Sequence, residues 1–253
     1  MPSWIHSAVA REALLADRGE PLFLADWERT LMLHYEVEPN ILQPYVPFAL
    51  DVLHGKAYVS LVAFTMRGLA PRRGGRACAL LFEPIATHEF LNVRTYVKHQ
   101  GECGIYFLAE WLPNKLSVLM GRPVFGLPYR LGKHAYQHDH ASGRIKGTVE
   151  AVGQRGALRY EAPVAGPFAP CTAGSLTEFL MERYTAFTDW RGIKRRFRVW
   201  HPPWLQAPVE AEIIDDTLLE LTGDWAQQAR YIGANYSPGM CSVWMGRPHF
   251  LSP

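Results

Sequence analysis

The sequence is poor in lysine, in paired cysteines and in long apolar runs. The lack of paired cysteines and of long apolar runs each argues against a class of protein. The four cysteines stand far apart without a Cys-x-x-Cys pair, which favours reduced thiols over a disulfide framework. No apolar run approaches the roughly 20 residues that a membrane-spanning helix needs. The first 21 residues lack the basic and apolar regions of a signal peptide. We therefore expect a cytoplasmic protein with no membrane partner.

Sequence motifs for nucleotides, metals and nucleic acids are also missing. The chain has no Gly-x-Gly-x-x-Gly, no Walker loop and no Gly-x-Ser-x-Gly elbow. Its net charge is only +2, so the basic segment at residues 193–200 favours a paired or solvated strand face over nucleic-acid binding. His138 and His140 would share a strand face, but a solvated strand end beside a turn explains them without a metal. We expect no cofactor, no metal and no nucleic-acid partner.

Alternating apolar and polar residues predict a chain built mainly of strands. Strands are expected at 30–37, 56–66, 89–97, 105–111, 193–200, 209–214 and 233–246, with a hairpin turning at Ser142-Gly143. Helices are expected at 7–19, ended by Gly19, and at 175–187, started by a capping box of Ser175 and Glu178, while 70–78 is expected to be a mobile loop. Without a βαβ rhythm, this predicts an α+β fold, predominantly antiparallel β and closed as a barrel. We expect a single domain over 1–253, with an N-terminal helical extension at 1–20.

The strand at 89–97 carries the most informative polar face. Asn92, Arg94 and Tyr96 point to one side of it. If that side looks into a barrel, Arg94 must be paired or must await an anion, because an unpaired buried guanidinium is very costly. Its forked donors suit a carboxylate ligand. An internal partner would be Glu89, Glu110 or Glu182, and the remaining alternative is a solvated face.

Several phrases occur in an order that is similar to a known family. They are HYEVEPNILQPYVPFALDVLHGKAYVSLVAFTM, LNVRTYV, GIYFLAEW, GRPVFGLPY, FLMERY, HPPW and NYSPG, between Trp27 and Trp244. Together they resemble the YqjF-like family of uncharacterised bacterial proteins, which looks like a branch of the acetoacetate decarboxylase superfamily. The resemblance implies a cone-shaped antiparallel β-barrel with a few flanking helices and an internal pocket.

The same resemblance shows a departure at the catalytic position. The decarboxylase motif Gly-Arg-x-x-x-x-x-Pro-Lys-Lys-Leu-Gly corresponds to GRPVFGLPYRLG at 121–132, where Tyr129 and Arg130 replace the two lysines. A phenol cannot form the imine on which those enzymes depend. Lys115 and Lys133 are close in sequence to this position. Lys133 would need a different backbone course to replace the lost lysine, and Lys115 stands at the start of the preceding helix, where the macrodipole disfavours a cation unless it is solvated. The resemblance also implies, by a match one residue out of register, that Glu89 is the pocket glutamate of the decarboxylases.

Two functional hypotheses remain open, both with a small carboxylate or carbonyl compound as the ligand. In the first, the protein is a lyase or hydrolase without a Schiff base, and Tyr129 is a general acid whose pKa Arg130 lowers. Arg94 or Arg130 would hold the anion, helped by Asn92, Tyr96 and Glu89, and His201 or Glu182 would be the base. In the second, the barrel is a non-catalytic small-molecule-binding module. A homo-oligomer built on aromatic surfaces is a further possibility.

Overall fold

The computed structural model describes residues 3–18 and 20–251. The helices are α1 (Ser3–Leu15), α2 (Pro39–Leu42), α3 (Gly75–Ala86), α4 (Lys115–Phe125) and α5 (Leu176–Met181), with 3-10 turns η1 (Gln43–Tyr45), η2 (His140–Ser142), η3 (Thr217–Thr222) and η4 (Asp224–Gln228). The strands are β1 (Phe23–Val37), β2 (Ala49–Leu50), β3 (Ala57–Pro71), β4 (His88–His99), β5 (Glu102–Leu112), β6 (Tyr129–Gln137), β7 (Arg144–Ala151), β8 (Ala157–Pro163), β9 (Ala169–Pro170), β10 (Thr185–Trp190), β11 (Ile193–Trp200), β12 (Leu205–Val209), β13 (Glu212–Asp215), β14 (Arg230–Met245) and β15 (His249–Phe250).

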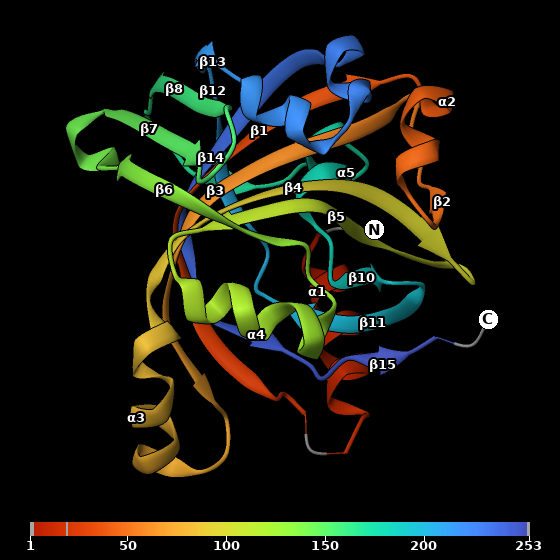
Figure 1. The fold of residues 1–253 in the computed structure, drawn as a ribbon, viewed down its shortest axis with the longest axis vertical. Helices are drawn as coiled ribbons and strands as arrows, with labels where there is room; N and C mark the ends of the chain where they lie inside the picture. Colours follow the sequence, from red (N-terminus) through yellow and green to blue (C-terminus); the bar gives the residue numbers. More distant parts are fainter. Residues whose placement is uncertain (1–2, 19, 252–253) are drawn as a thin grey trace.

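Seven of these strands form a closed ring. The order is β5-β10-β11-β14-β1-β3-β4, and pairing of β4 with β5 completes it. Every pair in the ring is antiparallel except β5 with β10. From β5 the sheet also continues through the parallel strand β6 into β7, β8 and β13 (Figure 1). The predicted, mainly antiparallel α+β fold is confirmed.

Strand β4 separates the interior of the ring from a large apolar core on its other face. Leu91, Val93 and Val97 belong to that core, which also contains side chains of β7, β8 and the η3–η4 segment. The alternate residues Asn92 and Arg94 therefore point into the ring, as the two-residue period of a strand requires. A register shift between Val93 and Arg94 opposite β5 marks a bulge, a feature that re-aims side chains.

Three local predictions need correction. The helix expected at 175–187 ends at Met181, because the chain after it is drawn into strand β10, which pairs with β5. The loop expected at 70–78 is instead the end of β3 followed by the start of α3 at Gly75. Ser175 caps α5 as predicted, but Glu178 takes the backbone N–H of Gly174 rather than that of Ser175. The helix end expected at Gly19 lies outside the described residues.

The glycines around α4 have distinct structural reasons. Asn114 caps the start of this helix by accepting a hydrogen bond from the N–H of Ser117. Gly126 ends it with φ of 72°, a left-handed conformation that favours glycine. At Gly121 an added Cβ would lie 2.2 Å from the ring of Tyr129, so only glycine lets the helix pack on that tyrosine.

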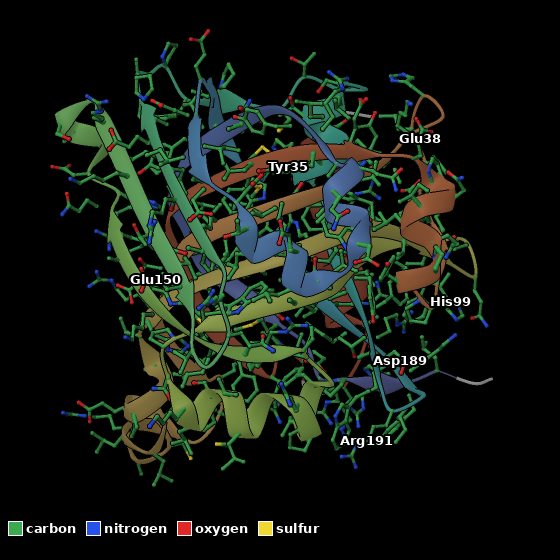
Figure 2. All side chains as sticks on the ribbon, turned by 45° about the horizontal axis from the view of Figure 1, so that its top comes forward. Tyr35, Glu38, His99, Glu150, Asp189 and Arg191 are labelled. Atoms are coloured by element: carbon green, nitrogen blue, oxygen red, sulfur yellow. The ribbon has the colours of Figure 1, made fainter. Side chains whose placement is uncertain are left out.

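The described surface carries both charged and apolar side chains, and the exposed apolar ones include Leu81 of α3 and Leu119 of α4. Glu38 and Arg191 lie at the periphery in Figure 2, and both are exposed. Arg196 and Arg198 of the basic segment both pair with Glu102, which agrees with the expectation of a paired strand face. None of the described helices combines the length and apolarity that crossing a bilayer would require.

Candidate functional site

A small cavity of about 90 Å³ lies inside the ring. Its walls are largely aromatic and aliphatic, and its polar lining includes four residues predicted from the sequence: Asn92, Arg94, Tyr129 and His201. Thr30, Glu110 and Trp204 also line it. The structure therefore brings the strand β4 face, the decarboxylase-like motif and the HPPW segment to one place.

Adjacent strands align three of these polar residues in a row. Asn92 of β4 lies opposite Glu110 of β5, and Glu110 lies opposite Tyr129 of β6. Side chains in such register lie on the same face of a sheet, close enough to interact. An amide, a carboxyl group and a phenol thus stand side by side along one wall of the cavity.

Five buried polar atoms of the cavity lining have no hydrogen-bond partner among the described residues. They are Thr30 Oγ1, Asn92 Oδ1, Arg94 Nε, Glu110 Oε1 and Trp204 Nε1. Buried polar atoms are nearly always paired in native proteins, so such an accumulation needs an explanation. A polar ligand or water in the cavity would satisfy them.

Arg94 is held in place without any acidic partner. Its Nη2 donates a hydrogen bond of 3.1 Å to the carbonyl oxygen of Leu180, which also accepts one of 2.8 Å from the hydroxyl of Tyr96. Within the described residues, the ion pairs closer than 4.0 Å do not include Arg94. The alternatives of an ion pair with Glu89, Glu110 or Glu182 and of a solvated face are therefore not observed.

A chain of buried hydrogen bonds behind Arg94 orients Tyr96. Asn235 donates through Nδ2 to Gln206, and its side chain also lies 3.1 Å from Nε2 of His34. The other ring nitrogen of His34 lies 2.8 Å from the hydroxyl of Ser60, and Ser60 donates to the hydroxyl of Tyr96 at 2.5 Å, because Tyr96 gives its own proton to Leu180. Burial, with a smaller effect of the Arg94 charge, lowers the pKa of His34 to about 3, so this chain stays neutral. Tyr96 thus donates to the same Leu180 carbonyl as Arg94 and does not line the cavity.

Burial favours the neutral, proton-donating forms of both Glu110 and Tyr129. Burial raises the pKa of the Glu110 carboxyl well above its ordinary value. Burial, and next the neighbouring Glu110, raise the pKa of the Tyr129 phenol well above its ordinary value. The expectation that Arg130 lowers the pKa of this phenol is therefore wrong. Arg130 lies on the opposite side of β6, where it donates to the carbonyl of Leu221.

His201 is also neutral, and it is a weak base. Its Nδ1 lies 2.7 Å from the carbonyl oxygen of Pro202 and so carries the proton, while its Nε2 is 3.4 Å from the carbonyl of Arg183. Burial lowers the pKa of His201 to about 4. The ring stands among aromatic neighbours, including Trp27 and Trp204.

Glu182 and Glu89 are not brought to the cavity. Glu182 accepts hydrogen bonds from the backbone N–H of Trp204 at 2.9 Å and from the hydroxyl of Tyr184 at 2.5 Å, and burial raises its pKa to about 7. It faces an outer groove beside α1 instead. Glu89 is half-buried on β4, where the two-residue strand period turns it to the face opposite that of Asn92.

No lysine lies among the residues that line the cavity, and Lys115 and Lys133 are both exposed. Among the described residues, no group of three or more histidine, cysteine, aspartate or glutamate side chains is placed to hold a metal ion. His138 is buried rather than solvated: its ring bonds the carbonyl of Arg29 and the hydroxyl of Tyr160.

Sequence reasoning missed Glu110 as a site residue and named it only as an ion-pair partner for Arg94. The signal was an isolated glutamate within the apolar strand segment IYFLAEW. A charged residue type at a buried strand position is unusual enough to mark a functional candidate.

Comparison with known proteins identifies the family of this chain. Residues 24–240 match the profile of the family DUF2071, described as an uncharacterised conserved protein. The chain belongs to this family. It is 30% identical over 210 residues to the uncharacterised protein YqjF of Bacillus subtilis, an alignment covering 78% of this chain and 80% of the relative.

Solved structures with a similar fold are acetoacetate decarboxylase-like. The acetoacetate decarboxylase of Legionella pneumophila superposes with a TM-score of 0.64 at 12% identity, covering 91% of this chain and 87% of that one. The enduracididine biosynthesis enzyme MppR, complexed with pyruvate, gives a TM-score of 0.62 at 13% identity, covering 94% and 93%. At such low identity these matches establish the acetoacetate decarboxylase-like fold of this family member.

Proposed function

We propose that the internal cavity binds a small carboxylate or carbonyl compound and that Glu110 and Tyr129 act on it as proton donors, without an imine. The observation that carries the proposal is the group of unpartnered buried polar atoms around one cavity, with the unpaired guanidinium of Arg94 among them. A fixed, desolvated cation without an acid partner is stabilised by an anionic ligand.

The volume of the cavity limits the ligand. A space of about 90 Å³ is well below the roughly 300–1,000 Å³ of pockets for drug-sized ligands, so only a small molecule fits. Acids with about two to four carbon atoms match this size, and the apolar wall disfavours a second charge. The pyruvate held by the fold neighbour MppR belongs to the same size class.

The two donors are suited to a carbonyl or developing oxyanion. If Arg94 holds the carboxylate, the protonated Glu110 and the phenol of Tyr129 stand on the adjoining wall. Each can donate a hydrogen bond to an oxygen that gains negative charge, a form of catalysis that operates best in a water-poor site. This chemistry fits a lyase that passes through an enolate or an alkoxide and needs no lysine.

A second candidate, a non-catalytic binding module, is favoured by one observation. The histidine on the lining, His201, has a pKa lowered to about 4, so it would be a weak base for proton abstraction. Such a protein would bind the same ligand and release it unchanged.

The test is a binding screen followed by a search for turnover. Small mono- and dicarboxylates and their keto acids are screened by thermal shift on the parent protein and on Arg94→Met, with Arg191→Gln as a control for loss of one exposed charge. Hits are then followed by proton NMR for chemical change. The proposal expects monocarboxylate hits that Arg94→Met loses and Arg191→Gln retains. Hits equal in all three proteins would contradict it, and unchanged ligand would favour the binding module.

Imine chemistry is tested separately. Borohydride is added to the protein with pyruvate or acetoacetate, and the intact mass is measured. We expect no adduct, since the cavity lining holds no lysine. A stable lysine adduct would overturn the non-imine part of the proposal.

A further inference from the structure

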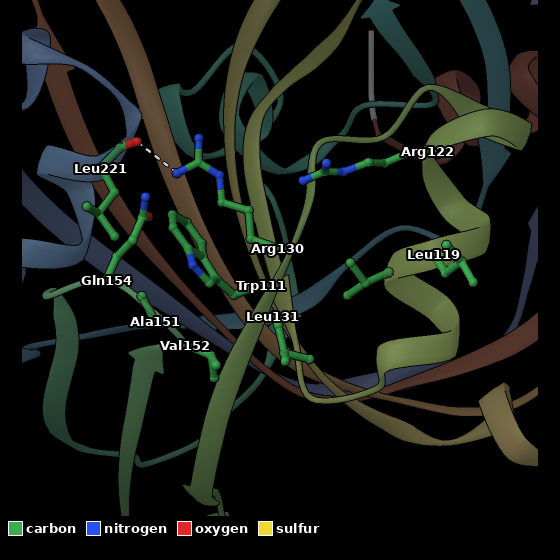
Figure 3. Close-up of a pocket in the computed structure, with 10 residues that line it drawn as sticks. Trp111, Leu119, Arg122, Arg130, Leu131, Ala151, Val152, Gln154 and Leu221 are labelled. Atoms are coloured by element: carbon green, nitrogen blue, oxygen red, sulfur yellow. Dashed lines mark hydrogen bonds between the residues drawn. The ribbon is translucent and has the colours of Figure 1, made fainter.

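A second and larger pocket lies on the side of strand β6 that faces away from the inner cavity. Its volume is about 520 Å³, and ten residues line it, among them Arg122, Arg130 and Trp111 (Figure 3). Volumes in this range accommodate ordinary metabolites. None of the ten lining residues is acidic, so two guanidinium groups share the pocket without a counter-charge of its own.

Both arginines are held in position by groups of the protein. Arg130 donates through Nη1 to the carbonyl oxygen of Leu221 at 2.8 Å, and its guanidinium lies 5.2 Å from the ring centroid of Trp111. Arg122, at the end of α4, donates through Nε and Nη2 to the carbonyl oxygen of Tyr129, at 3.1 and 2.7 Å. Figure 3 shows the Arg122 side chain extending toward Arg130. These contacts use part of each guanidinium and leave other N–H groups for a ligand.

The two charges disfavour each other. Partial burial, and next the charge of Arg122, lower the pKa of Arg130. Neither arginine has a carboxylate within 4.0 Å among the described residues. An anion bound in the pocket would offset both charges, and an arginine side chain can bind phosphate and carboxylate oxygens in a bidentate manner.

The rest of the pocket is apolar. Val118 and Leu119 come from α4, Leu131 from β6, and Val152 from the end of β7, with Gln154 as a neutral polar neighbour. Leu119 is 73% exposed, so an apolar side chain stands in water beside two cations. A ligand that combines negative charge with an apolar body would contact both features.

We propose that this outer pocket is a binding site for a small organic dianion with an apolar body, of the phosphate monoester or dicarboxylate class. The two guanidinium groups hold the charged end, and the side chains of α4 and β6 contact the body. This inference does not depend on the function of the inner cavity, because it uses none of the inner cavity's lining residues.

The experiment uses phenyl phosphate as the probe and isothermal titration calorimetry as the measurement. Phthalate tests the dicarboxylate source, inorganic phosphate tests the charge alone, and benzyl alcohol tests the apolar body alone. We expect saturable binding of phenyl phosphate or phthalate, affinity at least about tenfold weaker for inorganic phosphate, and no measurable binding of benzyl alcohol. Affinity should fall with added salt.

Three variants in the pocket and one surface control locate the binding. Arg130→Gln should weaken binding by about tenfold or more, since it removes one of two charged donors. Leu119→Glu should weaken it similarly by repulsion, and Leu119→Gln should weaken it less, by about threefold, through loss of an apolar contact. The exposed-surface control Arg191→Gln should stay within about twofold of the parent. Because Leu119 is exposed, its variants test the pocket without disturbing the core.

Three outcomes would overturn the proposal. The first is absence of saturable binding of both phenyl phosphate and phthalate to the parent protein. The second is equal affinity in the parent, Arg130→Gln and Leu119→Glu. The third is self-association that Leu119→Glu abolishes, measured by sedimentation, in a protein that binds neither probe; the pocket would then be part of an interface between copies of the chain.

Discussion

The inner cavity and the outer pocket are built on neighbouring residues of one strand, yet their chemistry is opposite. Tyr129 points into a cavity of about 90 Å³, where burial favours the neutral form of the acid Glu110. Arg130 points into an open pocket of about 520 Å³ that contains two charged guanidinium groups. Since side chains alternate across a strand, the neighbours Tyr129 and Arg130 belong to two pockets rather than one. The inner cavity holds the phenol, and the outer pocket holds the charge.

The largest expected effect is on ligand affinity of the inner cavity when its cation, Arg94, is removed. Arg94→Met should weaken inner-cavity binding of small carboxylates by about 100-fold, because the ligand loses its charged donors in a desolvated space. The free energy of unfolding should stay equal or rise by about 1 kcal/mol, since a buried charge without an acid partner is removed. Calorimetry and urea unfolding measure the two quantities. A large loss of stability with intact binding would show that Arg94 is structural.

The second prediction concerns the neutral acid, which has no counterpart in the outer pocket. The pKa of Glu110 is raised on folding, so the folded protein holds a proton that the unfolded chain releases above its ordinary pKa. Stability from this group is therefore complete below about pH 4.5 and falls as pH rises toward the folded pKa, by up to about 1.4 kcal/mol per pH unit.

Glu110→Gln keeps the shape of the side chain and removes this titration. Relative to the parent, its free energy of unfolding should improve progressively between pH 5 and about pH 8, as measured by urea unfolding. Glu83→Gln, at an exposed position of α3, is the control and should show no such trend. A Glu110→Gln curve parallel to that of the parent would mean that the carboxyl is already ionised in the folded protein.

A smaller effect is expected from the phenol. Tyr129→Phe removes one neutral donor from the inner cavity, so carboxylate or carbonyl ligands should bind about threefold to tenfold more weakly. If turnover is found, the rate constant should fall more than the affinity does, because the donor acts on developing charge. An unchanged rate constant would leave Tyr129 with no role as an acid.

The smallest effect tests the independence of the two sites. Arg130→Gln should leave the affinity of the inner cavity for small carboxylates within about twofold, since Arg130 lies on the other side of β6 and contacts Leu221 and Trp111. Parent and variant are compared in the same carboxylate titration. A loss of carboxylate affinity as large as that of Arg94→Met would show that Arg130 and Arg94 belong to one site.

The fold and the polar face of β4 could be predicted from the sequence because both depend on local periodicity. Alternation placed Asn92 and Arg94 on one side of a strand, and the ring of strands turns that side inward. The family resemblance located Tyr129. The antiparallel fold was therefore within reach of the sequence, although the closure of the ring depends on pairings between distant segments.

The remainder of the candidate site depends on contacts between segments far apart in the chain. Arg130 was expected beside Tyr129 in function, yet alternation on β6 sends the two to opposite sides. Glu182 was expected as a base, but the chain turn after α5 commits its oxygens to Trp204 and Tyr184. Two further properties depend on tertiary packing: Arg94 has no acidic partner, and burial favours the neutral form of Glu110. The alternation of residues along a strand does not predict either of them.

The protonation state of Glu110 tests the central claim most directly. The infrared difference spectrum between the parent protein and Glu110→Gln is recorded from neutral pH upward. At pH 7 we predict the carbonyl band of a protonated carboxylic acid in the parent, replaced by carboxylate bands only at a pH well above the ordinary range of glutamate. Carboxylate bands alone at pH 7 would contradict the account, because the cavity would then hold a negative charge where a small anion is proposed to bind.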